Sequence, residues 1–351
     1  MTIVLFVFIF SLLVLVHEFG HYVSAVLSGI RVEEFAIGFP PRLWSKTTRR
    51  GTVISLNAIP IGGFVRLEGE DHPGGKNAFT SQSILRRSFV IVSGVVMNVL
   101  LAFVLLTGVL VLGAPMVESD LPPSAVVSDQ YIEIVNVLAD TPAARAGVQP
   151  AERIIAVGGQ SITSIEQLQG IVTEHVGTAL DFTLASASGQ RSLTITPTTI
   201  RNQVGIGVEL LPMVTVRLPI HTAVVQAAAI TGRQLWAITN GLVGLMMDLM
   251  RGNNVSEHIV GPVGITKFVG VAATSGWFAV INLMILLSLN LAVVNILPIP
   301  ALDGGRLFFL LLSALFTVPT RIERKIHQFG FIALLALLAL ITVNDLRAYL
   351  P

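Results

Sequence analysis

The most constraining feature of this chain is an apolar run at its start that is interrupted by three ionisable side chains. Residues 3–16 carry no charge and apolar character resumes over Tyr22–Leu27, whereas His17–His21 between them reads HEFGH. The run predicts one membrane-spanning helix, and because it lacks the basic start and cleavage site of a signal peptide we expect it to be retained. Ionisable residues are rare inside such helices and mark functional sites. The sequence therefore predicts a spanning helix that carries a polar site.

Composition indicates a membrane protein with an additional soluble part. Of 351 residues, 53% are hydrophobic and 12% are charged, which is too apolar for an ordinary soluble protein and too long for a helix bundle alone. The net charge of +1 gives no reason to expect nucleic acid as a partner. The chain has no cysteine, so any metal site must use histidine and carboxylate ligands.

Apolar runs predict a multi-pass α-helical protein of about four spans, the last of them a short one over Phe329–Val343. The loop after the first span is rich in Arg and Lys, whereas the next extramembrane segment opens with acids only, over Glu118–Asp129. By the positive-inside rule the first loop is cytoplasmic and both termini are extracytoplasmic. The run Leu235–Met247 is too short to cross, and we expect an amphipathic helix on the outer surface there.

These considerations divide the chain into consecutive segments. They are a first span with the HEFGH motif (1–28), a cytoplasmic loop with β-strands (29–87), a second span (88–113), an extracytoplasmic α+β module (125–210), an extracytoplasmic amphipathic helical segment (211–275), a third span (276–306), and a cytoplasmic-side helix followed by the fourth span (307–351).

Strand-like patterns occur in both extramembrane parts. The strands expected in the cytoplasmic loop are Val32–Ile37, Thr52–Ile59 and Gly63–Glu68, which predicts a small β-sheet at the membrane surface. The pair Gly62-Gly63 allows close backbone approach, although a plain turn is equally favoured. In the module the expected strands are Ile132–Val137, Ile154–Val157 and Leu193–Ile195, with helices near Pro142–Ala146 and Ser164–Val176.

The HEFGH motif permits metal chemistry. His17 and His21 are four residues apart, so on a helix they share a face and can bind one Zn²⁺, with Glu18 placed to act on metal-bound water. The alternative is a polar patch buried between helices. Two histidines do not complete a catalytic zinc site, which normally has three protein ligands and an open position. A third ligand is therefore required.

Asp303 is the best candidate for the third ligand. It follows a proline-broken segment, Asn295–Leu302, which is expected on the same membrane face as His17, and the two glycines after it let the chain bend. The alternative role of Asp303 is the N-cap of a helix over Leu307–Val318.

The HEFGH helix, the Asn295–Gly305 segment, the Gly261–Ile265 stretch and the interposed module together resemble the bacterial site-2 protease family of regulated intramembrane zinc metalloproteases. The resemblance implies that His17, His21 and Asp303 bind zinc and that Glu18 is the general base. It also implies one PDZ-like domain in the module and a membrane-associated β-loop near the substrate. Many relatives have a proline after the glycine that corresponds to Gly94, where this chain has valine.

The expected function is that of an intramembrane zinc endopeptidase in the bacterial cytoplasmic membrane. Its expected partners are the lipid bilayer, single-span membrane substrates such as anti-sigma factors and remnant signal peptides, and a peptide or C-terminal ligand of the PDZ-like domain, for which Gly205–Val208 is the candidate carboxylate loop. The candidate substrate-binding residues are Asn295, Asn290, Gly62, Gly63, Phe64 and Val65. For the two asparagines, helix-to-helix hydrogen bonding is equally favoured. The competing functions are a His/Asp metal transporter and a non-catalytic PDZ scaffold.

Overall fold

The computed structural model describes residues 1–70, 74–117, 125–186, 189–200, 203–253, 260–316 and 319–349. Residues 118–124, which supply the first acids of the predicted extracytoplasmic segment, and residues 317–318 lie outside this described part. The chain divides into two compact units. The first comprises Met1–Leu105, Ala228–Val271 and Ile281–Pro351, and the second comprises Leu106–Ala227 and Ala272–Val280.

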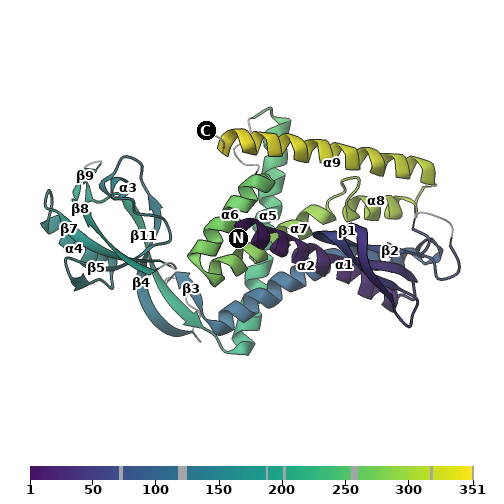
Figure 1. Ribbon diagram of the computed structural model, residues 1–351, viewed down its shortest axis with the longest axis horizontal. Coiled ribbons are helices and arrows are strands. Elements are labelled where there is room, and N and C mark those ends of the chain that lie inside the picture. Colours follow the sequence, from purple (N-terminus) through teal and green to yellow (C-terminus); the bar gives the residue numbers. More distant parts are fainter. Residues whose placement is uncertain are drawn as a thin grey trace. The chain divides into compact units, whose positions relative to one another are not determined.

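Four described helices are long and apolar enough to cross a membrane (Figure 1). They are α1 (Thr2–Leu27), α2 (Ile84–Leu112), α7 (Trp277–Ile296) and, over Arg321–Arg347, α9 (Thr320–Tyr349). At about 1.5 Å per residue, even the 20-residue α7 reaches about 30 Å, the thickness of a bilayer core. Their surfaces are mostly exposed and apolar, as expected for helices whose solvent is lipid.

The last helix is longer than the predicted short span. α9 begins directly after Pro319 and includes the basic residues Arg321, Arg324 and Lys325, which hydropathy excludes from a span but which are good helix formers. The amphipathic helix expected over Leu235–Met247 is likewise longer, since α5 extends over Ile220–Met250. Hydropathy therefore located these helices but not their ends.

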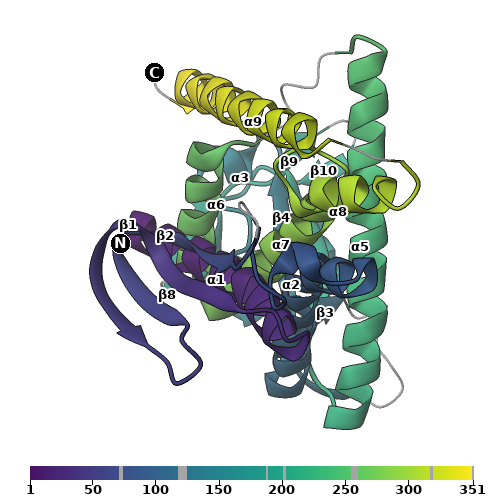
Figure 2. The ribbon, with the colours of Figure 1, turned by 90° about the vertical axis from the view of Figure 1, so that its right-hand side faces the viewer.

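The first loop folds into a hairpin of two long strands, β1 (Val32–Thr47) and β2 (Val53–Leu67), rather than three short ones (Figure 2). Residues 34–37 of β1 pair on one side with the start of β2 and on the other side with its end, Gly63–Arg66. The predicted breaks at glycine and proline are therefore bends within continuous strands. One bend lies at Gly38, where φ is +78°. Only glycine fits there, because a side chain would collide with the carbonyl of Ile59.

The second unit contains an antiparallel sheet in the order β3-β11-β4-β5-β7-β8, with β6 paired to β5. The strands are β3 (Ala114–Val117), β4 (Val126–Val137), β5 (Arg153–Val157), β6 (Gln160–Ser161), β7 (Leu180–Ser186), β8 (Gly189–Ile195) and β11 (Val208–Arg217). A separate pair joins β9 (Thr198–Ile200) and β10 (Gln203–Gly205). The helices are α3 (Pro142–Arg145) and α4 (Ile165–Glu174).

The core of this unit lies between the sheet and α4. Ile132, Ile154 and Phe182 of the sheet are almost fully buried against Leu168 and Val172 of α4. All three predicted strands and both predicted helices of the module are present, but the long strands β7 and β11 and the short strands β6, β9 and β10 were not predicted. β11 contains Pro212, which normally disfavours a strand; it is tolerated because the partner β3 pairs only with residues 213–216.

Candidate metal centre

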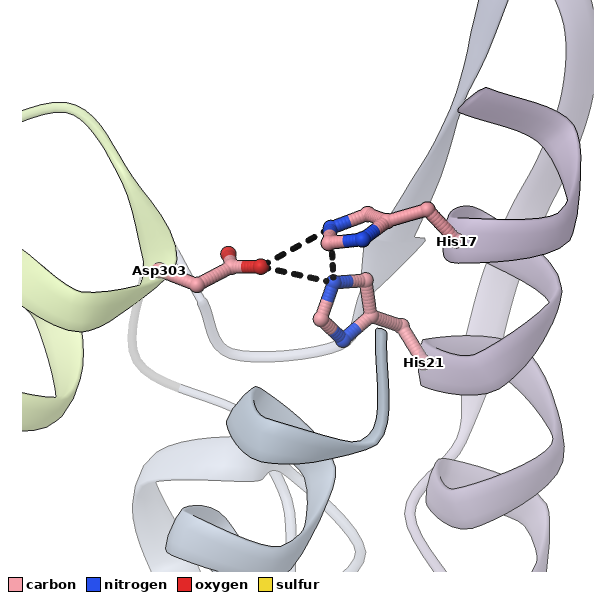
Figure 3. A group of neighbouring side chains, drawn as sticks. All are labelled: His17, His21 and Asp303. Atoms are coloured by element: carbon pink, nitrogen blue, oxygen red, sulfur yellow. Dashed lines mark hydrogen bonds and ion pairs between the residues drawn. The ribbon is translucent and has the colours of Figure 1, made fainter. Parts of the chain in front are cut away.

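His17 and His21 lie one turn apart on α1, and their Nε2 atoms are 3.2 Å from each other (Figure 3). His17 belongs to the buried stripe of this helix, with Leu13 and Gly20, and only 6% of its surface is exposed. The heptad-like spacing of this stripe turns both imidazoles away from the apolar outer surface of the helix. The two rings are therefore presented together to the interior of the first unit.

Asp303 reaches the same place from the start of α8 (Asp303–Leu312). Its Oδ2 lies 2.9 Å from Nε2 of His17 and 3.2 Å from Nε2 of His21, as Figure 3 shows. The N-cap of α8 is Leu302, and Asp303 stands inside the first turn, so the alternative N-cap role of Asp303 is wrong. The predicted helix over Leu307–Val318 in fact ends at Leu312.

The sequence Asp-Gly-Gly is required by the packing around it. A side chain on Gly304 would collide with the carbonyls of Ile296 and Leu297, and one on Gly305 with the carbonyl of Ile299. The segment between α7 and α8 therefore folds back tightly on itself, as the two prolines predict. This turn brings Asp303 to α1 across 286 residues of sequence.

The three ligand atoms have the spacing of a zinc site. Zn–N and Zn–O bonds of about 2.0–2.1 Å place neighbouring tetrahedral ligands about 3.3 Å apart. The three observed separations are 2.9, 3.2 and 3.2 Å, and all the ligand atoms lie within 4.8 Å of one another. Two imidazoles and a carboxylate form a ligand set that zinc accepts. The residues present therefore fit this metal.

The second nitrogen of each ring has a partner on α2. Nδ1 of His21 donates to the carbonyl of Val90 at 2.8 Å, which leaves Nε2 free as a ligand. Nδ1 of His17 lies 3.3 Å from the side-chain amide of Asn98, a fully buried residue of α2. Nδ2 of Asn98 is the atom that faces Nδ1 of His17, so this buried amide holds the orientation of the ring.

α2 approaches both imidazole rings at Gly94. A Cβ at this position would lie 2.5 Å from Nε2 of His21 and 2.7 Å from Nε2 of His17. Gly20 lies between His17 and His21 on α1, and a Cβ there would lie 2.5 Å from the carbonyl oxygen of Ser93 in α2. The two helices therefore touch through glycines, and α2 is a continuous helix across Gly94.

Glu18 faces the β-hairpin. Its Oε2 accepts a 3.1 Å hydrogen bond from the backbone N–H of Val65 in β2. A Cβ on Gly63 would lie 2.5 Å from the carbonyl oxygen of Ala36 and 2.9 Å from Leu15 of α1. The prediction of close backbone approach is thus confirmed for Gly63, while Gly62, at φ +74°, forms a bend beside Val14.

The other candidate residues lie at different distances from the metal centre. Asn295 lies at the metal centre, with its Nδ2 3.5 Å from Nε2 of His17. Asn290 donates to the carbonyl of Leu286 in its own helix, and among the described residues no hydrogen bond joins it to the centre or to another helix. Phe64 stacks on Phe39 within the hairpin. Sequence reasoning did not assign a role to Asn98, although a buried amide in an apolar span was a usable signal.

The chain was compared with known proteins. The model of peptidase family M50 matches residues 5–337. The chain belongs to peptidase family M50. Like the M50 site-2 proteases it is a membrane-embedded zinc metallopeptidase, and Zn²⁺ is its cofactor.

Relatives of this M50 protein carry the name "Putative zinc metalloprotease". One from Fusobacterium nucleatum is 31% identical over 98% of both chains. One from Agrobacterium fabrum is 27% identical over 99% of this chain and 96% of its own, and one from Clostridium perfringens is 28% identical over 96% of both. Among solved structures, the PDZ domain of the SdrC-like protein of Listeria monocytogenes is 20% identical, with a TM-score of 0.22, over 24% of this chain and 92% of that domain.

Proposed function

We propose that this M50 peptidase cuts peptide bonds of membrane-spanning substrates, with zinc held by His17, His21 and Asp303 and with Glu18 as general base. The observation that carries the proposal is the convergence of Nε2 of both histidines and Oδ2 of Asp303 within 4.8 Å. These groups come from distant segments of an apolar, helix-rich unit, where uncompensated polar groups are costly. A shared metal accounts for their meeting better than a structural polar patch does, because Gly94 keeps a Cβ away from both Nε2 atoms.

Zinc, when bound here, supplies Lewis-acid activation of the attacking water and of the scissile carbonyl. Glu18 takes the proton from the attacking water and passes it to the leaving amine. The Val65 N–H holds the carboxylate of Glu18 beside the centre before substrate arrives. Asn295, next to His17, is placed to bind the backbone of an unwound substrate.

The end of β2 offers a route for presenting that backbone. A transmembrane helix hides its peptide groups in internal hydrogen bonds, so the substrate must unwind before cleavage. Residues 63–66 pair with β1 along one edge, and on the other side the Val65 N–H points to Glu18. An extended substrate can add to this edge as a further strand, with Gly62, Gly63, Phe64 and Val65 beside it.

The proposed substrates are single-span membrane proteins, such as anti-sigma factors or remnant signal peptides, in regulated intramembrane proteolysis. We place the enzyme in the bacterial cytoplasmic membrane with four spans, both termini and the 125–210 module outside, and the β-hairpin at the cytoplasmic face. The positive-inside distribution of Arg and Lys supports this orientation. The module is proposed to be PDZ-like and to bind peptides or chain termini. Substrate class and module role rest on the family resemblance.

The test is cleavage of a single-span reporter by purified protein in liposomes. Glu18→Gln is expected to lower the rate by about 10²- to 10⁴-fold, as loss of a general base does. The matched control is Glu33→Gln, at an exposed carboxylate of β1, which should cut at the wild-type rate. Equal rates for wild type, Glu18→Gln and chelator-treated protein would refute the proposal. Zinc flux into the liposomes without cleavage would instead favour a transporter.

A further inference from the structure

The segment that delivers Asp303 contains a backbone conformation that needs external support. Ala301, two residues before Asp303, has φ +80°, in the left-handed region that residues with a Cβ rarely adopt. Such conformations persist only where the surrounding structure holds them, and they gather at functional sites. The neighbouring Leu302 continues directly into the first turn of α8. A change at Ala301 is therefore transmitted to the Asp303 carboxylate.

The support comes from α9, through His327. The N–H of Ala301 donates a 2.9 Å hydrogen bond to Nδ1 of His327. The ring of His327 packs against the ring of Phe309 in α8, with centroids 5.4 Å apart at 62°, which fixes its orientation. Because Nδ1 accepts, Nε2 carries the proton, and this Nε2 is buried with no hydrogen-bond partner among the described residues. An apolar side chain would fill this place without burying that N–H, so the distinctive contribution of the ring is its acceptor, Nδ1.

A second contact from the same face of α9 reaches the same segment. His327 and Gly330 are three residues apart and so are neighbours on the helix surface. A Cβ on Gly330 would lie 2.5 Å from Cβ of Pro300 and 2.8 Å from its carbonyl oxygen. α9 therefore lies in direct contact with residues 300–301, and the two contacts together define where the ligand segment turns.

We propose that His327 is a positioning residue for the metal centre. Its Nδ1 holds Ala301 in the left-handed conformation and so aligns Oδ2 of Asp303 with the Nε2 atoms of His17 and His21. This inference rests on the proposed role of Asp303 as a zinc ligand. His327 lies on α9, far from the HEFGH motif in sequence, and contacts Ala301 and Phe309, neither of which is a proposed metal ligand.

Zinc affinity of the detergent-solubilised full chain, measured by competition with a chelator, tests the proposal. His327→Ala is expected to weaken zinc binding by about 10- to 100-fold, the range for residues that orient metal ligands. His327→Asn should restore most of the affinity, because its Oδ1 can accept where Nδ1 did. His221→Ala, at an exposed histidine of α5, should bind as wild type does. Wild-type affinity in His327→Ala, or an Asn variant as weak as Ala, would overturn the proposal.

A second readout follows the supporting bond itself. Hydrogen exchange at the Ala301 amide should accelerate in His327→Ala and stay slow in His327→Asn; unchanged exchange in both would also overturn the proposal. Gly330→Ala, which pushes on Pro300, should weaken zinc binding in the same direction, whereas Gly244→Ala, with open space around it, should not. If His327→Ala fails to fold, the zinc affinity of Gly330→Ala decides whether the contact of α9 with residues 300–301 positions Asp303.

Asp303→Asn separates this inference from the proposed function. If Asp303→Asn binds zinc as tightly as wild type, the proposed ligand set fails, and the positioning role fails with it. If Asp303→Asn loses zinc while His327→Ala and Gly330→Ala retain it, only the role of His327 is rejected.

Discussion

The backbone N–H of Val65 donates a 3.1 Å hydrogen bond to the carboxylate of Glu18. This bond joins the end of the β-hairpin to the helix that carries the proposed base, so strand position and base position are coupled. In the proposed mode of binding, an extended substrate that pairs with the edge of β2 would compete for the same N–H. Strand addition would then free Glu18 at the moment when a peptide bond reaches the centre.

Displacing β2 from α1 should lower catalysis without removing the metal. In Gly63→Val the new side chain meets the carbonyl of Ala36 and the side chain of Leu15. We expect a fall in cleavage rate on the order of 10- to 100-fold, because small misplacements of catalytic groups carry costs of this size. Zinc content should stay at the wild-type level. Gly75→Ala, where the added methyl has only ordinary contacts, is the control, and equal rates in the two variants would contradict the coupling.

Filling the space at Gly94 should abolish zinc binding. In Gly94→Ala the methyl group would lie 2.5–2.7 Å from the Nε2 atoms of His21 and His17, where the metal has to bind. Metal analysis of the purified variant should show little zinc, and cleavage should fall with it. Gly108→Ala on the same helix has nothing within 4 Å and should keep its zinc. A fully loaded, active Gly94→Ala protein would exclude these two histidines as ligands.

Removing the amide beside His17 should weaken the metal centre. Asn98→Leu replaces the amide with an apolar side chain of similar shape, so the ring of His17 loses the polar contact that orients it. Zinc affinity is expected to fall by about 10- to 100-fold in a chelator competition. Asn290→Leu, whose amide bonds only to its own helix, should keep the wild-type affinity. If both variants bind equally well, Asn98 does not orient His17.

The second unit should show a pH-dependent response at Glu133 of β4. Burial raises the pKa of this carboxyl above its ordinary value, and the nearby Arg153 opposes the shift only in part. With a raised folded-state pKa, its stabilising contribution is complete below the unfolded pKa and is lost as the pH rises through the folded pKa. Glu133→Gln should therefore raise the unfolding temperature at pH 7 and lose this advantage below about pH 4.

Two measurements on the full chain test the predicted change in stability with pH. One is the unfolding temperature, and the other is hydrogen exchange in the sheet of the second unit. Glu209→Gln, at an exposed position of β11, is the control and should change the midpoint little at either pH. If Glu133→Gln raised the unfolding temperature more at pH 4 than at pH 7, the predicted direction of the pKa shift of Glu133 would be wrong.

Local patterns were readable from the sequence. The four-residue spacing of His17 and His21 reflects helix periodicity, and the runs of apolar residues reflect the cost of exposing polar backbone to lipid; both depend on neighbours in the chain. Helix ends were less readable, as the charged start of α9 shows, because propensity and hydropathy diverge there. The long β1 and β2 strands were divided too early for a similar reason, since glycine and proline can bend a paired strand as well as end it.

What the sequence by itself determined is the chemistry of the site: a pair of histidines, a glutamate between them and a need for a third ligand. The sequence also offered Asp303 as the candidate third ligand, but only the tertiary structure decided that these groups meet. It brought Asp303 to both Nε2 atoms, set Gly94 against the two rings, and placed the Val65 N–H on Glu18. These relationships arise from the packing of segments far apart in the chain, and no local periodicity encodes the distance between such segments.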